Sequence, residues 1–231
     1  MRRFVFALAV FFLVFVAVRP EFAAAASEVT RSKTIDAADI NSLTVKAAVG
    51  AVRIERAEID AIEVQVRLKA KRTTGIFSSL PDVETIEVSA TTRGDQLTLE
   101  VDAKNVEERW VVRVPAKILS ALSVKLAVGG VSITAPAKRI EVDVGVGDAN
   151  LDVPSGAISL TLGTGDGSIR TALTNAGPIE GKTGVGSASI SGVNGSVRSS
   201  TIGGSIKGDG KGREPIEATV GVGDLSITLY E

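Results

Sequence analysis

The side chains available for chemistry are few in kind. The chain has no histidine and no cysteine, so it has no Ser-His-Asp triad, no thiolate nucleophile and no imidazole or thiolate ligand for a metal. Acid–base catalysis would rest on Asp, Glu, Lys, Arg or the single tyrosine, Tyr230. The carboxylates show no clustered motif. The composition therefore predicts a protein that is not an enzyme and that holds no cofactor.

Three aspartates recur at one offset of a repeated segment. Asp148, Asp166 and Asp224 each follow a glycine, and stacked carboxylates beside backbone carbonyls would suit Ca²⁺. Gly-Asp is also a good turn sequence by itself, and no GGxGxD-like run accompanies it. Both interpretations, an ion site and a plain turn, stay open.

One loop carries apolar side chains. Ile76, Phe77 and Leu80 lie together in TTGIFSSLPD (73–82), and Phe77 is the last phenylalanine of the chain. An apolar loop can contact a membrane or a partner, or it can fold back and cover an open end of the core. Trp110 shares a strand face with Val112 and Val114, which predicts a packing role for its ring.

Self-similarity is the strongest signal in the sequence. A segment of fourteen positions has Leu or Ile at positions 1 and 12 and glycine at position 8. The copies are LTVKAAVGAVRIER (43–56), LSVKLAVGGVSITA (122–135), IEVDVGVGDANLDV (140–153), ISLTLGTGDGSIRT (158–171), IEGKTGVGSASISG (179–192), IEATVGVGDLSITL (216–229) and, with one residue deleted, VRSSTIGGSIKGDG (197–210). The turn glycines at position 8 are Gly50, Gly129, Gly147, Gly165, Gly186, Gly203 and Gly223.

Alternation within each copy predicts two short strands. Ile140, Val142, Val144 and Val146 alternate with polar residues, as in a half-buried strand. Glycine at position 8 predicts a corner with positive φ, after which positions 10 and 12 point inward again. Antiparallel hairpins and a stack of coils both fit this unit. The same residue type at each offset favours the stack, because like neighbours then form ladders, and the fold class predicted is an all-β, β-helix-like solenoid.

The stretch between the first two copies differs. Residues 62–71, 85–92, 96–101 and 108–114 predict longer antiparallel strands, with Arg93-Gly94-Asp95 as a turn. We expect these strands to form a sheet over the N-terminal end of the stack.

These features resemble a known family. Early strands with a VGxV-type corner, the strand that ends in Val-Pro within WVVRVPAKILSALSV (110–124), and the later V-G-[GDS] units are similar to the putative-adhesin family of exported bacterial β-strand-repeat proteins. The resemblance covers about residues 30–231. It implies an exported, repetitive β domain of unknown function, and it offers no catalytic residues.

The N-terminal segment predicts export. Arg2 and Arg3 precede an apolar run, residues 4–18, and small residues end at Ala26, which is typical of a cleaved signal peptide. An uncleaved anchor is the alternative, although the run is short for a membrane span. The domains expected are a signal peptide (1–26), an N-terminal β region with the first repeat and covering sheet (27–120) and a β-repeat region (121–231). A net charge of −1 gives no footprint for nucleic acid.

Together these features favour a non-catalytic protein of the cell envelope, periplasmic, surface-attached or extracellular. It would be adhesin-like or an accessory binding or scaffold domain, because repeat surfaces commonly bind. Its partner would be an envelope protein or a cell-surface glycan. The alternatives are a structural solenoid that self-assembles through a C-terminal edge strand and a polysaccharide-active β-helix enzyme.

Overall fold

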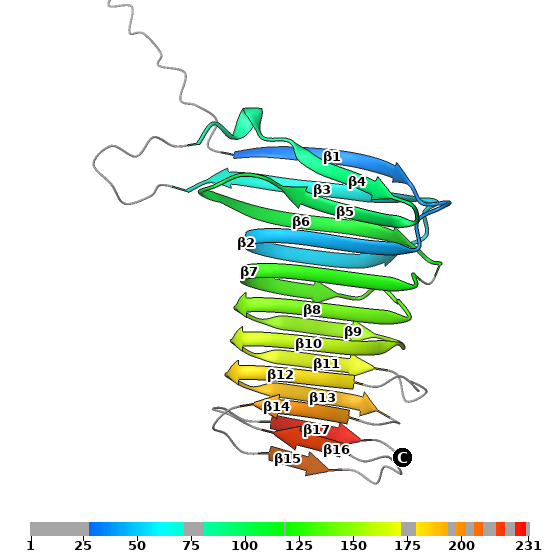
Figure 1. Ribbon diagram of the computed structural model, residues 1–231, viewed down its shortest axis with the longest axis vertical. Coiled ribbons are helices and arrows are strands. Elements are labelled where there is room, and N and C mark those ends of the chain that lie inside the picture. The colour runs from blue at the N-terminus through cyan, green and yellow to red at the C-terminus, as the bar shows by residue number, and fades with distance from the viewer. Residues whose placement is uncertain are drawn as a thin grey trace, which may run out of the picture.

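The computed structural model describes residues 28–71, 81–117, 119–171, 179–193, 197–201, 206–209, 216–219 and 225–229, and side chains as far as residue 191. The described residues form seventeen β-strands of one sheet and a single 3₁₀ turn, η1 (Val83–Thr85). The strands lie one beneath another in a tall stack (Figure 1). The predicted signal peptide and its cleavage position at Ala26 lie outside the described residues.

The strands of the N-terminal region are long. They are β1 (Glu28–Asp36), β2 (Ser42–Ala57), β3 (Ala61–Ala70), β4 (Val88–Arg93), β5 (Gln96–Val101) and β6 (Val106–Pro115). Three of the four predicted strands of this region match β3, β5 and β6 to within two residues. The strand expected from residue 85 begins only at Val88, because Asp82 caps η1 by accepting a hydrogen bond from the backbone N–H of Glu84.

The strands of the repeats follow the corners. They are β7 (Ala121–Ile133), β8 (Arg139–Val146), β9 (Ala149–Val153), β10 (Ala157–Thr164), β11 (Gly167–Thr171), β12 (Ile179–Val185), β13 (Ala188–Val193), β14 (Val197–Thr201), β15 (Ile206–Asp209), β16 (Ile216–Thr219) and β17 (Leu225–Leu229). In β2 and β7 one strand continues through the corner, whereas each later copy is split into two strands.

Copies pair in parallel with like positions in register. The first strands form the series β2, β7, β8, β10, β12, and Leu122 lies opposite Ile140, which lies opposite Ile158. The second strands form the series β7, β9, β11, β13 with the same register. The antiparallel hairpin alternative, in which position 7 of a copy faces its own position 10, is not formed in these copies.

An additional coil tops the stack. β5 and β6 pair in parallel with β2, so that Leu97 takes position 1 opposite Leu43, and Glu108 takes position 8 opposite Gly50. The antiparallel strands lie beyond this coil, with β4 on β5, β3 on β6, and β1 on β3. The cover expected from the sequence therefore consists of β1, β3 and β4, while β5 and β6 belong to the stack itself.

The core is built of ladders of aliphatic side chains. The side chain at position 12 is buried in each copy whose side chains are described. These residues are Ile54, Ile133, Leu151, Ile169 and Ile190. Ala149 and Leu151 point inward as expected, each exposed by 3% or less. Burial of this kind contributes about 25 cal/mol for each Å² of apolar surface removed from water. The ladders thus supply the packing energy of a chain without disulfides.

The far end of the stack has an unexpected order. β17 pairs with β13 on one side and with β15 on the other, so the last strand lies inside the sheet. The expectation that the last strand forms the free edge is therefore wrong. Within the described segments, β15 and β16 are the strands of this end that have one partner each, β17 and β14 respectively.

Candidate interaction surface along the glycine corners

The glycine corners bring neighbouring coils into very close contact. Gly50, Gly129, Gly147, Gly165 and Gly186 all have φ between 134° and 140°, a region that residues with a side chain rarely adopt. A Cβ atom on Gly147 would lie 1.8 Å from the carbonyl oxygen of Gly129, and one on Gly165 would lie 2.0 Å from that of Gly147. Position 8 therefore requires glycine for two reasons. Its φ is positive, and the backbone of the coil above leaves no room for a Cβ atom. Gly203 and Gly223 lie outside the described residues.

A second glycine column runs beside the first. Gly145, Gly163 and Gly184 occupy position 6, and a Cβ on Gly163 would lie 2.4 Å from the carbonyl oxygen of Gly145. Sequence reasoning missed this column, although its spacing of 18 residues between Gly145 and Gly163 was visible. At both columns the backbone of one coil packs directly against the backbone of the next.

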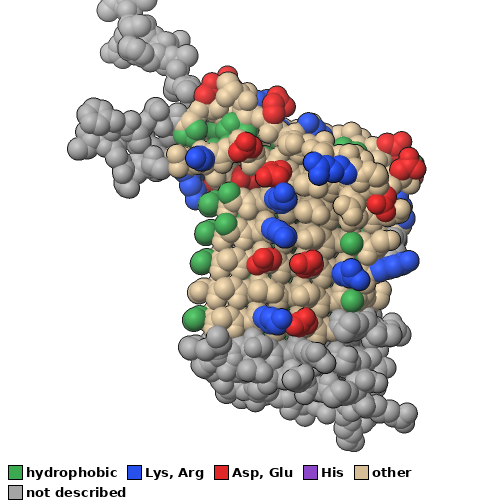
Figure 2. Space-filling view, viewed as in Figure 1, with side chains coloured by type: hydrophobic (Ala, Val, Ile, Leu, Met, Phe, Trp, Pro, Cys, Tyr) green, Lys and Arg blue, Asp and Glu red, His purple; other side chains and the backbone are tan. Residues whose placement is uncertain are grey.

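Between the two columns, position 7 points out into solvent. Val128, Val146 and Val185 are 44%, 50% and 48% exposed, and they lie in register with Val49 and Thr164. Figure 2 shows hydrophobic side chains in a row down one edge of the stack. The prediction that Val146 points inward is wrong, because the chain leaves the flat strand at the corner and alternation no longer sets its direction. We call Val49, Val128, Val146 and Val185 the valine row.

A groove runs along the stack next to the valine row. Its volume is about 670 Å³, and positions 9, 10 and 11 of five successive copies line it. The lining residues are Ala51, Val52, Arg53, Gly130, Val131, Ser132, Asp148, Ala149, Asn150, Asp166, Gly167, Ser168, Ser187, Ala188 and Ser189. Most of these residues are small. We call it the corner groove.

The corner aspartates hold successive coils together. The Oδ1 atom of Asp148 accepts a hydrogen bond of 3.0 Å from the backbone N–H of Asp166, and the Oδ1 atom of Asp166 accepts one of 2.8 Å from that of Ser187. Backbone bonds alternate with these, as from the N–H of Ala149 to the carbonyl oxygen of Asp166 at 3.0 Å. Asp148 and Asp166 thus each accept a hydrogen bond from an N–H group of the next coil.

The ion-site interpretation of these corners stays a prediction. Within the described part of the chain, no group of three or more acidic side chains is placed so that it could hold a metal ion. Asp224, the third aspartate of the predicted ladder, lies outside that part. Ile76, Phe77 and Leu80 of the apolar loop, and Tyr230, also lie outside it.

Glu108 and Trp110 close the upper end of the corner column. Glu108 is fully buried, its Oε2 atom accepts a hydrogen bond of 2.7 Å from the indole N–H of Trp110, and its Oε1 atom accepts one of 3.2 Å from the backbone N–H of Ala48. Burial raises the pKa of the Glu108 carboxyl above its usual range, against the opposing effect of both hydrogen bonds. The packing role predicted for Trp110 agrees with its 1% exposure.

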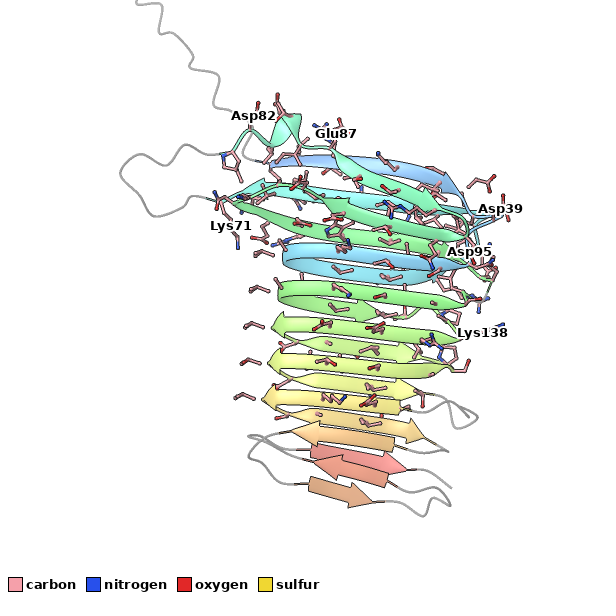
Figure 3. The ribbon with its side chains drawn as sticks, viewed as in Figure 1. Asp39, Lys71, Asp82, Glu87, Asp95 and Lys138 are labelled. Atoms are coloured by element: carbon pink, nitrogen blue, oxygen red, sulfur yellow. The ribbon has the colours of Figure 1, made fainter. Side chains whose placement is uncertain are left out.

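Ion pairs gather in the N-terminal strands, and one of their members, Arg53, also lines the corner groove. Arg113 contacts Glu55 at 3.1 Å and Glu63 at 3.5 Å, and Lys46 contacts Glu100 at 3.3 Å. The Arg113 hydrogen bond holds the pKa of Glu55 below its usual range. In Figure 3, the charged side chains Asp39, Asp95 and Lys138 lie at the edge opposite Lys71.

A search of the described residues finds no helix with the length and apolar character that crossing a membrane requires.

Comparisons with known proteins give distant structural neighbours. No family model matches the chain, and no curated protein matches it. A putative cell adhesion protein from Clostridium sporogenes is 13% identical, with a TM-score of 0.45, and the alignment covers 88% of this chain and 100% of that protein. A putative adhesin from Bacteroides fragilis is 14% identical, with a TM-score of 0.36 and coverage of 87% and 96%.

A third neighbour has a different description. It is a putative lipid binding protein from Parabacteroides distasonis, 12% identical, with a TM-score of 0.31 and coverage of 89% and 98%. At these identities and TM-scores the likeness carries no conclusion about this chain. Its own geometry defines it as an all-β repeat protein with an apolar row and a groove along one edge.

Proposed function

We propose that this chain is a non-catalytic, exported protein of the cell envelope, in which the repeats form a β-solenoid whose corner edge binds another molecule. The corner groove carries this proposal, because the same three positions of five successive copies line it. A surface that the repeat itself builds grows with the number of copies, as the binding surfaces of repeat proteins do. The adjoining valine row adds apolar area that a partner would bury.

The chemistry of the edge fits binding better than catalysis. Small neutral side chains predominate along the groove, and its two carboxylates already accept hydrogen bonds from the backbone. The carboxyl group with a raised pKa, Glu108, is buried in the core and is engaged by Trp110 and Ala48. It therefore has no access to a substrate at the groove. The partner class proposed is an envelope protein or a cell-surface glycan.

A paired capture experiment tests the groove as the binding site. Asn150 is exposed in β9 and lines the groove, so Asn150→Trp should fill it without disturbing the core. Thr161→Trp is the matched control, since Thr161 is exposed on β10 of the next copy and is outside the lining. Tagged wild-type protein and both variants are expressed through the chain's own N-terminal segment and crosslinked in cells.

The outcomes separate clearly. Recovery of the same partner with wild type and Thr161→Trp, but not with Asn150→Trp, is the expected result. Equal recovery with Asn150→Trp would show that the groove is not the site, and recovery of no partner with any protein would contradict a binding function. Depolymerisation of a cell-wall glycan by the pure protein would contradict its non-catalytic character.

Self-assembly is a second candidate function, favoured by β15 and β16. Each has one pairing partner among the described residues, and such a strand is a template for another chain. The expected result is an oligomer whose size in sedimentation rises with concentration and which loses this dependence after Lys207→Pro in β15. A monomer at all concentrations would contradict this function.

A further inference from the structure

The corner groove carries an uncompensated negative charge. Its charged lining residues are Arg53, Asp148 and Asp166, and Arg53 is already paired with Glu55 at 2.9 Å. Among the described residues, neither aspartate takes part in an ion pair. The charge that a ligand meets in the groove is therefore that of two neighbouring carboxylates, one coil apart.

Polar atoms recur along the groove at every coil. Ser132, Asn150, Ser168 and Ser189 occupy position 11 of four successive copies, and neighbouring strands of a sheet are about 4.8 Å apart. An acyl chain offers these hydroxyl and amide groups no hydrogen-bond partner. A peptide backbone supplies N–H and C=O groups that can pair with them.

Other features of the lining agree with a peptide. The groove has no aromatic side chain in its lining, so a sugar ring would find no face on which to stack. Five coils span about 19 Å from the first to the last. An extended chain rises about 3.3 Å per residue, so about six residues fill the groove. The valine row lies along the groove and can pack against apolar side chains of such a segment.

From these observations we infer that the corner groove binds an extended protein segment of about six residues that has apolar side chains and a lysine or arginine near its middle. Asp148 and Asp166 belong to the third and fourth of the five coils, which places the cation near the centre of the segment. Each carboxylate uses its Oδ1 atom for the next coil, which leaves Oδ2 for the ligand. This inference rests on the proposed function and specifies the partner of the same site.

The test uses a displayed library of random seven-residue peptides. Peptides are selected on the wild-type protein after depletion on Asn150→Trp, so that only sequences which need an open groove are kept. The expected result is an enrichment of Lys and Arg over Asp and Glu of at least about threefold, with apolar residues on both sides. Binding of the selected peptides should weaken as salt increases, because exposed charges are screened.

A double variant isolates the two carboxylates. In D148N/D166N each amide keeps an Oδ1 atom that can accept the N–H group of the next coil, so the stack is preserved while the charge is lost. We expect a selected basic peptide to bind this variant about tenfold more weakly, with Asp143→Asn, on the first strand of the copy, as the control. Equal binding to wild type and to D148N/D166N would overturn the inference.

Failure of the inference differs from failure of the proposed function. Selected peptides without a basic residue, or no peptide that distinguishes wild type from Asn150→Trp, would overturn the peptide assignment. If Asn150→Trp still abolished capture of a cellular partner, the groove would remain the binding site for another class of ligand. If capture were also unaffected, the proposed function would fall with the inference.

Discussion

The top coil of the stack and the coils beneath it form the same corner in different ways. In the repeats, position 8 is a glycine with φ near 135°, whereas in the coil of β5 and β6 that position is Glu108. Six residues, 102–107, separate positions 5 and 8 there, where the repeats have two. Above Glu108 runs the antiparallel strand β3 instead of another corner. The comparison shows that position 8 requires glycine where the corner of another coil packs above it. The turn conformation is a second requirement.

The two regions also differ in what surrounds their strands. Eight of the nine ion pairs of the described residues lie between residues 28 and 113, in β1 to β6 and the loops that join them, and the ninth joins Lys182 to Glu180. Charged edges and a cover of antiparallel strands discourage further pairing at the N-terminal end. The corner edge of the repeats instead exposes small residues and valine, which suits contact with a partner.

The largest effect is expected at a glycine corner. Gly147→Ala should destabilise the protein by about 4 kcal/mol or more, since the new Cβ meets the carbonyl of Gly129 in addition to the strain of positive φ. Gly94→Ala is the control, because Gly94 has φ 60° but no atom within 4 Å of its Cβ position; it should cost about 1–2 kcal/mol. Urea denaturation measures both, and equal losses would contradict the close-approach explanation.

The next largest effect on stability distinguishes a buried valine of β8 from an exposed one beside the corner. Val144→Thr places a hydroxyl group in the core, where Val144 is fully buried, and should cost about 1–3 kcal/mol. Val146→Thr changes a half-exposed side chain and should alter the free energy of unfolding by less than about 0.5 kcal/mol. Thermal unfolding followed by circular dichroism compares the two, and a large loss for Val146→Thr would show that position 7 belongs to the core.

A smaller effect concerns pH, and its sign differs between two glutamates. Burial raises the pKa of Glu108 above the usual 4.5, so its contribution to stability is present below that pH and is lost as pH rises through the raised pKa. Wild type should therefore lose stability relative to Glu108→Gln as the pH rises above 4.5.

For Glu55 the opposite dependence is expected. Arg113 lowers the pKa of Glu55, so its contribution is present above pH 4.5 and is lost as pH falls through the lowered value. Wild type should thus lose stability relative to Glu55→Gln on acidification. Urea titrations at several pH values measure both pairs, and the same sign for both glutamates would contradict the assignment of Glu108 as a buried carboxyl.

The smallest effect is expected in the aspartate ladder. Asp166→Ala removes the acceptor of the Ser187 N–H group and should cost about 0.5–1.5 kcal/mol. Asp166→Asn keeps an acceptor oxygen and should stay within about 0.5 kcal/mol of wild type. If the two variants were equally stable, the hydrogen bond to Ser187 would have no role in joining the coils.

Sequence reasoning found those features that repeat at a constant offset. The corner glycines, the inward ladder at position 12 and the strand boundaries of β5 all follow from periodicity and turn chemistry. The coil of β5 and β6 escaped notice because residues 102–107 break the spacing and Glu108 replaces glycine. Its burial was nevertheless detectable, since Glu108 has the same parity as Trp110 and Val112 on one strand.

The surface itself was less accessible to such reasoning. Outward exposure of Val146 depends on how the chain turns at Gly147, which alternation cannot describe. The groove is formed by side chains of five copies that are far apart in sequence and become neighbours through stacking. The position of β17 between β13 and β15 likewise reverses the order of the copies, and no local pattern encodes it.

Like-on-like register gives the molecule an adjustable length. Between Gly129, Gly147 and Gly165 one copy occupies 18 residues, and every inserted copy of that size would lengthen the stack by about 4.8 Å. Because each coil meets its neighbours through the same ladders, such an insertion leaves both ends as they are. A tandem duplication of one copy then lengthens the corner edge by a fixed step. It alters only the interface between the two coils that the new copy separates.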